Sequence, residues 1–109
     1  MSVQHVVLFN FDPELNEEDK AEMFAQVGSW PAEIGGFDEL RLGPPADTER
    51  TRGFHYLLYM VVGDEDALGR YLVHPVHRGF AAWVVEHGGT VLAFDYRLDE
   101  GTVIPTGTG

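Results

Sequence analysis

Two histidines and a tyrosine stand close together in the segment YLVHPVHRGF, residues 71–80. Neutral imidazole is a suitable general base near pH 7, and a tyrosine hydroxyl can donate a hydrogen bond to an oxyanion as it forms. Tyr71 and His77 are therefore a candidate acid–base pair, provided that the fold turns both toward one cavity. His74 precedes Pro75, and we expect it to bond a free carbonyl at a helix end and to be structural.

The same residues also fit roles without chemistry. A buried histidine bonded to the backbone, or a tyrosine packed with its hydroxyl satisfied, is common in protein cores. A metal bound by His5, His55, His74 and His77 is a further alternative, but none of the recognised ligand spacings is present. We therefore predict no metal and no cofactor. Because the chain has no cysteine, thiol nucleophiles and thiolate metal sites are excluded.

Composition narrows the function classes. The formal net charge is -11 with only seven lysines and arginines, which argues against nucleic acid and anionic membranes as partners. With 44% apolar residues, the 109-residue chain can bury one core but not two. The N-terminus shows neither a basic stretch nor a cleavage site, so we expect a cytoplasmic protein. The single lysine among these cations suggests a GC-rich bacterial genome.

The elements that must position these side chains can be read from periodicity and caps. Apolar strands are predicted at Val3–Phe11, 37–42, Phe54–Val62 and 90–98, and helices at 16–30, from Asp64 to the break at Pro75, and at 75–87. We assign residues 1–99 to one domain and 100–109 to a flexible tail.

The order of these elements is β-α-β-β-α-β, the α+β, ferredoxin-like arrangement, with the second helix broken at Pro75. Both helices then pack on one face of a four-stranded antiparallel sheet. Three strands are apolar on both sides, so the other face would expose a large apolar patch. We expect a homodimer that buries this face and encloses a barrel. The alternatives are a covering loop, although Pro44–Gly53 is polar, or a different protein partner.

The strand HVVLFNF, the strand GFHYLLYMVV, the segment YLVHPVHRGF and the final LAFDY resemble the stress-responsive dimeric α/β-barrel (Dabb) family. The resemblance covers residues 3 to 96, and its most specific part is the histidine–proline–x–histidine element with its upstream tyrosine. It implies a dimeric α/β barrel formed by two facing sheets. Family membership fixes a fold better than a function, because one fold hosts several chemistries.

One branch of that family, the plant polyketide cyclases, closes a linear tetraketide by intramolecular aldol condensation with a histidine–tyrosine pair. The resemblance implies that His77 and Tyr71 are this pair and that an apolar pocket surrounds them, lined by His5, His55, Phe9, Leu57, Phe80 and Val84. The expected function is acid–base catalysis on a polyketide-like carbonyl substrate. The alternative is a non-catalytic stress-response or ligand-binding protein, since other members are associated with stress protection or a divalent ion.

Overall fold

The structure is a computed structural model that describes residues 2–99 and 104–107. Its elements follow in the order β1 (Val3–Phe11), α1 (Glu17–Glu33), β2 (Phe37–Gly43), β3 (Tyr56–Val62), α2 (Glu65–Val73), α3 (Pro75–Glu86) and β4 (Gly89–Arg97). This confirms the ferredoxin-like prediction, including the break at Pro75. The predicted flexible tail falls largely outside the described residues. Within them, no helix is both long and apolar enough to cross a bilayer.

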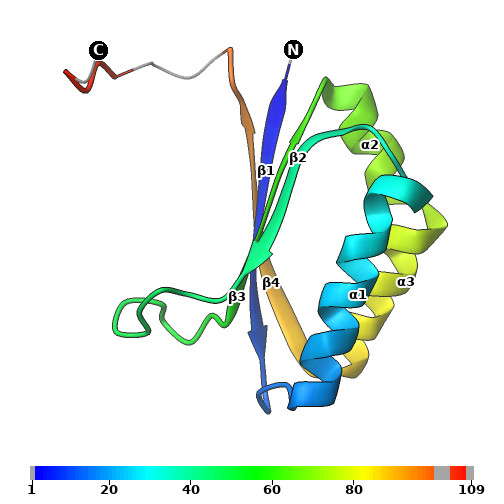
Figure 1. Ribbon diagram of the computed structural model, residues 1–109, viewed down its shortest axis with the longest axis vertical. Coiled ribbons are helices and arrows are strands. Elements are labelled where there is room, and N and C mark those ends of the chain that lie inside the picture. The colour runs from blue at the N-terminus through cyan, green and yellow to red at the C-terminus, as the bar shows by residue number, and fades with distance from the viewer. Residues whose placement is uncertain (1, 100–103, 108–109) are drawn as a thin grey trace.

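The four strands form one antiparallel sheet in the order β2-β3-β1-β4. His5 in the middle of β1 faces Met60 of β3 on one side and Asp95 of β4 on the other. Side chains of a strand alternate between faces, so these three residues share one face. In Figure 1 the sheet is seen edge-on, and all three helices lie on one side of it. The odd-numbered residues of β1 are buried on this helix-covered face.

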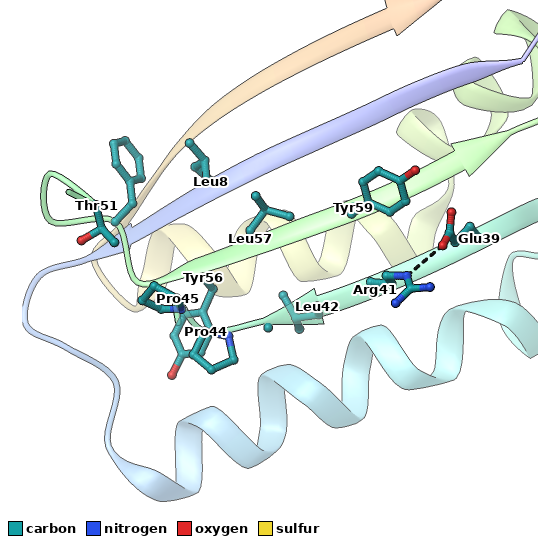
Figure 2. A pocket seen from close by; sticks show the side chains of 12 residues that line it. Leu8, Glu39, Arg41, Leu42, Pro44, Pro45, Thr51, Tyr56, Leu57 and Tyr59 are labelled. Atoms are coloured by element: carbon teal, nitrogen blue, oxygen red, sulfur yellow. Dashed lines mark hydrogen bonds and ion pairs between the residues drawn. The ribbon is translucent and has the colours of Figure 1, made fainter. Parts of the chain in front are cut away.

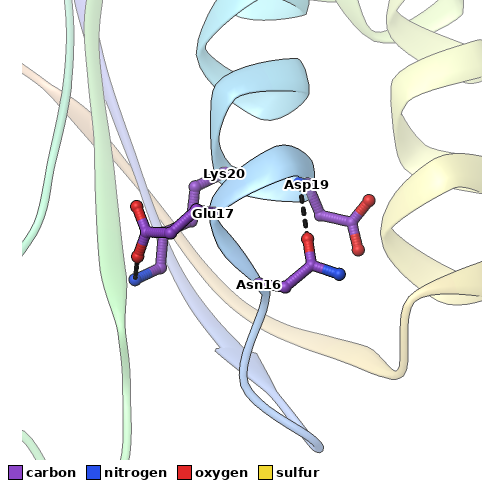
Figure 3. Close-up of polar contacts among 4 residues, drawn as sticks. All are labelled: Asn16, Glu17, Asp19 and Lys20. Atoms are coloured by element: carbon purple, nitrogen blue, oxygen red, sulfur yellow. Dashed lines mark hydrogen bonds and ion pairs between the residues drawn. The ribbon is translucent and has the colours of Figure 1, made fainter.

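Helix α1 begins where its sequence provides a cap. The Asn16 side chain accepts a hydrogen bond from the Asp19 backbone N–H at 2.8 Å (Figure 3). The acids Glu17, Glu18 and Asp19 follow in the first turn. Both features stabilise the positive end of a helix. The helix continues to Glu33, three residues beyond its predicted end, and Trp30 closes the last turn by accepting from the Ile34 N–H at 2.8 Å.

The break between α2 and α3 is made by His74 and Pro75. His74 has extended backbone angles, φ -64° and ψ 136°, as expected before a proline, and Pro75 starts α3. The His74 Nδ1 accepts a hydrogen bond from the Val76 backbone N–H at 3.1 Å. The expected bond from His74 to a free carbonyl is therefore wrong. Since the residue has already left α2, its ring reaches forward and caps the start of α3.

The sheet face opposite the helices is apolar and open. It carries Val6 and Leu8 from β1, Leu57 from β3, and Leu92, Phe94 and Tyr96 from β4. Phe94 is 67% exposed and Leu57 is 40% exposed. Among the described residues, no helix covers this face, and the segment between β2 and β3 bends toward its side at one end (Figure 1). The predicted uncovered apolar face is thus present in the chain.

Candidate functional site

A cavity of about 280 Å³ lies between the helices α2 and α3 and the strands β1 and β4. Its wall carries two histidines and a tyrosine, and the rest of the wall is apolar. The residues that line it are His5, Val7, Phe9, Leu58, Tyr71, Leu72, His77, Phe80, Ala81, Val84, Val85, Gly89, Val91 and Ala93. Leu72, Val85 and Val91 are exposed and mark its rim. The cavity has the apolar wall and few polar groups that are typical of small-molecule sites.

Tyr71 lies near the end of α2 and His77 lies in the first turn of α3, so the two residues meet across the break at His74 and Pro75. The centroids of their rings are 4.3 Å apart, and the Tyr71 ring also meets His5 at 5.8 Å and Trp30 at 5.4 Å. Tyr71 is only 2% exposed. Burial, and secondarily the charge of Asp95, raises the pKa of the Tyr71 hydroxyl well above its usual value. The hydroxyl therefore stays protonated and is a hydrogen-bond donor.

Tyr71 lines the cavity, and its hydroxyl has no protein partner in the described part of the chain. In the described part of the chain, the fully enclosed side-chain atoms without a hydrogen-bond partner are the indole nitrogens of Trp30 and Trp83. The Tyr71 oxygen is not among them, and no described protein group bonds it. A buried phenol with this arrangement is free to donate to a ligand in the cavity.

His77 is held in one tautomer by the chain itself. Its Nδ1 lies 3.1 Å from the Leu72 carbonyl oxygen, which can only accept, so Nδ1 carries the hydrogen. In the neutral ring, Nε2 then carries the lone pair. Burial lowers the pKa of His77 below its ordinary value of 6.5, the Leu72 hydrogen bond opposes this, and the nearby His5 adds to it. The neutral imidazole, which can accept a proton, therefore predominates at pH 7.

His5 is the third polar group of the cavity and is 4% exposed. Its Nδ1 forms a short hydrogen bond with the carboxylate of Asp95, its neighbour across the β1–β4 pair. Sequence reasoning singled out His5 but missed Asp95. A signal was available, because aspartate is depleted inside strands and Asp95 interrupts the apolar strand 90–98. Only the strand register, however, shows that it faces His5.

The structure brings six of the eight predicted site residues to this cavity: His5, Phe9, Tyr71, His77, Phe80 and Val84. It does not bring His55 and Leu57 there, which corrects the predicted lining. Leu57 points to the opposite sheet face, because the residues of β3 that face His5 are the even-numbered ones.

His55 lies just before β3, at the end of the sheet. Its Nδ1 accepts from the Phe11 N–H at 3.0 Å, and its Nε2 lies 3.2 Å from a Glu14 carboxylate oxygen. With His55 there and His74 capping α3, the four histidines considered as metal ligands do not meet. Within the described residues, no group of three or more histidines and acids could hold a metal ion.

A larger hollow of about 630 Å³ lies on the open sheet face (Figure 2). The strands β2 and β3 form its floor, with Leu57, Tyr59 and the paired Arg41 and Glu39 along it. The segment that follows β2 closes one end with Pro44 and Pro45. No histidine lines this hollow. It forms part of the apolar face rather than of the imidazole–phenol site.

Comparison with known proteins gives consistent matches along the chain. The family model described as Stress responsive A/B Barrel Domain (Dabb) matches residues 3–98. An uncharacterized protein of Streptomyces coelicolor is 32% identical over 92 residues, which cover 76% of this chain and 94% of that protein. Olivetolic acid cyclase of Cannabis sativa is 23% identical over 97 residues, covering 88% of this chain and 96% of the cyclase.

Solved structures show the same fold. The hydroxynitrile lyase from Passiflora edulis superposes with a TM-score of 0.81 at 15% identity, over 94% of this chain and 97% of the lyase. A dimeric ferredoxin-like protein from Thermobifida fusca gives a TM-score of 0.77 at 18% identity, over 90% of this chain and 92% of that one. Proteins with different activities therefore share this arrangement of strands and helices.

Proposed function

The chain belongs to the stress-responsive A/B barrel domain family, and from this premise we propose that it is a homodimer whose cavity performs acid–base chemistry on a small apolar carbonyl compound of polyketide type. The observation that carries the proposal is the pairing of Tyr71 and His77 in one apolar cavity, with ring centroids 4.3 Å apart. The likeness to olivetolic acid cyclase supports the substrate class.

The reaction begins with a proton transfer from carbon. The lone pair of His77 Nε2 takes a proton from the carbon next to a carbonyl group, and the electrons of that C–H bond form an enolate. The developing oxyanion accepts a hydrogen bond from the Tyr71 hydroxyl, which remains protonated. In a substrate with a second carbonyl group, the enolate carbon attacks that group and closes a ring, and His77 returns its proton to the new alkoxide.

The apolar walls of the cavity help this chemistry. Phe9, Phe80 and Val84 are buried around it, and they keep water away from the enolate oxygen. Electrostatic and hydrogen-bond interactions are stronger where water is excluded. The volume of about 280 Å³ suits a compound of small size rather than a polymer.

The dimer is proposed from the open sheet face. A contiguous apolar face that includes Phe94 and Leu57 is unfavourable in water, and a second copy can cover it by a two-fold axis. The dimeric ferredoxin-like protein from Thermobifida fusca supports this assembly. The cavity lies on the other side of the sheet, so the dimer leaves it accessible.

The test is ring closure of linear poly-β-ketone substrates, followed by absorbance and mass spectrometry. We expect turnover by the unmodified protein, and loss of at least about a hundredfold in rate for His77→Ala, since general acid–base catalysis typically contributes that much. Tyr71→Phe should also lower the rate. His87→Ala is the control, because the His87 ring bonds the Trp83 carbonyl at the end of α3, outside the cavity. If both site variants match the unmodified protein, the catalytic proposal fails.

A non-catalytic ligand-binding protein is the second candidate, and the predominantly apolar cavity wall favours it. In that case, small apolar compounds bind without turnover, and His77→Ala changes stability alone. An unsatisfied buried partner would then cost about 1–3 kcal/mol. Calorimetric titration with the same substrates separates the two candidates, because binding without conversion contradicts the first.

A further inference from the structure

The proposed mechanism does not use a second polar pair, His5 and Asp95, of which His5 lines the cavity. His5 comes from the central strand β1 and Asp95 from the edge strand β4, and the two are direct neighbours across the β1–β4 pairing. Their side chains form a short hydrogen bond between the His5 Nδ1 and a carboxylate oxygen of Asp95. His5 is almost fully buried, whereas the Asp95 side chain is 49% exposed.

This hydrogen bond fixes the chemistry of the His5 ring. An ionised carboxylate only accepts, so His5 Nδ1 must carry a hydrogen, and Nε2 is the nitrogen left for other partners. In the described part of the chain, no protein group bonds Nε2, and this atom is not among the fully enclosed unsatisfied ones. Because His5 lines the cavity and its Nδ1 is taken by Asp95, Nε2 is the ring nitrogen available to a ligand there.

The groups around His5 come from every neighbouring element. The Tyr71 ring of α2 lies edge-on at 5.8 Å, and His5 is near enough to His77 of α3 to help lower the pKa of His77. The β3 neighbour is the apolar Met60. Farther along β4, Arg97 pairs with Glu65 at the start of α2. Asp95 is thus the acid that bonds His5, and Tyr71 supplies a hydroxyl beside it in the cavity.

We propose that Asp95 is a positioning residue that orients His5, so that His5 Nε2 accepts a hydrogen bond from the O–H of an enol or phenol on a small apolar ligand, while the Tyr71 hydroxyl donates to the same oxygen. This rests on the proposed function of the cavity as a small-molecule site, but it requires no turnover. Two groups that meet one oxygen from different elements fix its place more closely than one does.

The first test observes the His5 ring directly. Long-range proton–nitrogen NMR spectra distinguish the two neutral imidazole tautomers. We expect His5 in the Nδ1–H form in the unmodified protein and in Asp95→Asn, whose amide oxygen still accepts. Asp95→Ala should let the Nε2–H form appear. Glu22→Ala, which removes an exposed acid on α1, is the matched control and should leave the spectrum unchanged.

The second test measures binding of 4-nitrophenol by calorimetry at a pH below the pKa of the free phenol, so that its O–H is present for His5 Nε2 to accept from. Asp95→Ala and His5→Ala should each weaken binding about tenfold, the effect of one lost hydrogen bond to the ligand. Asp95→Asn should retain most of the affinity. Since Asp95 acts through His5, the double variant should bind no more weakly than His5→Ala alone.

Three results would overturn the inference: an unchanged His5 spectrum in Asp95→Ala, additive losses in the double variant, or no binding of 4-nitrophenol by the unmodified protein. Each can be distinguished from failure of the proposed function, because neither test depends on turnover. If ring closure is absent while the tautomer and binding results hold, the cavity binds enols or phenols without converting them.

Discussion

At the scale of single residues, the burial of His77 connects its chemistry to pH. Its pKa lies below the ordinary 6.5, so the folded protein binds this proton less readily than the unfolded chain. The contribution of the neutral His77 ring to the free energy of unfolding is therefore complete above about pH 6.5. It is lost progressively as the pH falls toward the folded-state pKa. We expect His77→Gln to remove this part of the pH dependence. Urea unfolding between pH 5 and about pH 8 measures it, and equal slopes in both proteins would contradict the burial argument.

Tyr71→Phe removes the hydroxyl and keeps the ring, so it shows what the hydroxyl alone contributes. The ring packs against Trp30, Phe37, His5 and His77, whereas no described protein group bonds the hydroxyl. We therefore expect the free energy of unfolding to change by less than about 1 kcal/mol, while Tyr71→Ala should cost about 3–5 kcal/mol. Thermal and urea unfolding give these values. A large loss in Tyr71→Phe would show that the hydroxyl serves the fold rather than a ligand.

At the scale of elements, His74 decides where α3 begins and hence where His77 lies. Its ring caps α3 by accepting from the Val76 N–H, so His74→Ala should cost about 1 kcal/mol of unfolding free energy. Asparagine is a good N-cap, and His74→Asn should restore most of the loss. Urea unfolding of the three proteins is the measurement. Equal stability of the alanine and asparagine variants would mean that the cap does not stabilise α3.

Periodicity and caps predicted the elements well, because their determinants are local. Asn16 and Asp64 cap their helices as expected, and Pro75 divides the second helical region. The predictions that were wrong about the cavity lining depend on contacts between distant segments of the chain. The strand alternation grouped His55 with Leu57, but the β1–β3 register shows that Leu57 faces away from His5, and His55 lies before β3 begins.

The same limit applies to the candidate site. Tyr71 and His77 could be paired from the sequence, since they are six residues apart and flank a proline. Asp95 could not, because it is 90 residues from His5 and meets it only through the β1–β4 pairing. His74 is structural, as predicted, but its expected hydrogen-bond partner was wrong for a different reason: a histidine at a helix junction can bond either helix, and the backbone angles decide which.

At the scale of the whole molecule, the open sheet face should control assembly. Phe94→Asp places a charge on the most exposed aromatic side chain of that face and should convert the proposed dimer to a monomer, because burying an unpaired charge is costly. Val73→Asp is the matched control, since Val73 is also exposed but lies on α2, across the sheet. Analytical ultracentrifugation at low micromolar concentration measures the mass. A Phe94→Asp protein that remains dimeric would place the interface elsewhere.

The most direct test of the account is whether the cavity removes a proton from carbon. Incorporation of deuterium next to the ketone of ethyl acetoacetate in D₂O, followed by NMR, reports this step without requiring the natural substrate. The account predicts exchange faster than in buffer alone, falling by about a hundredfold in His77→Gln and also reduced in Tyr71→Phe. Exchange no faster than in buffer, or exchange by His77→Gln at the rate of the unmodified protein, would contradict it.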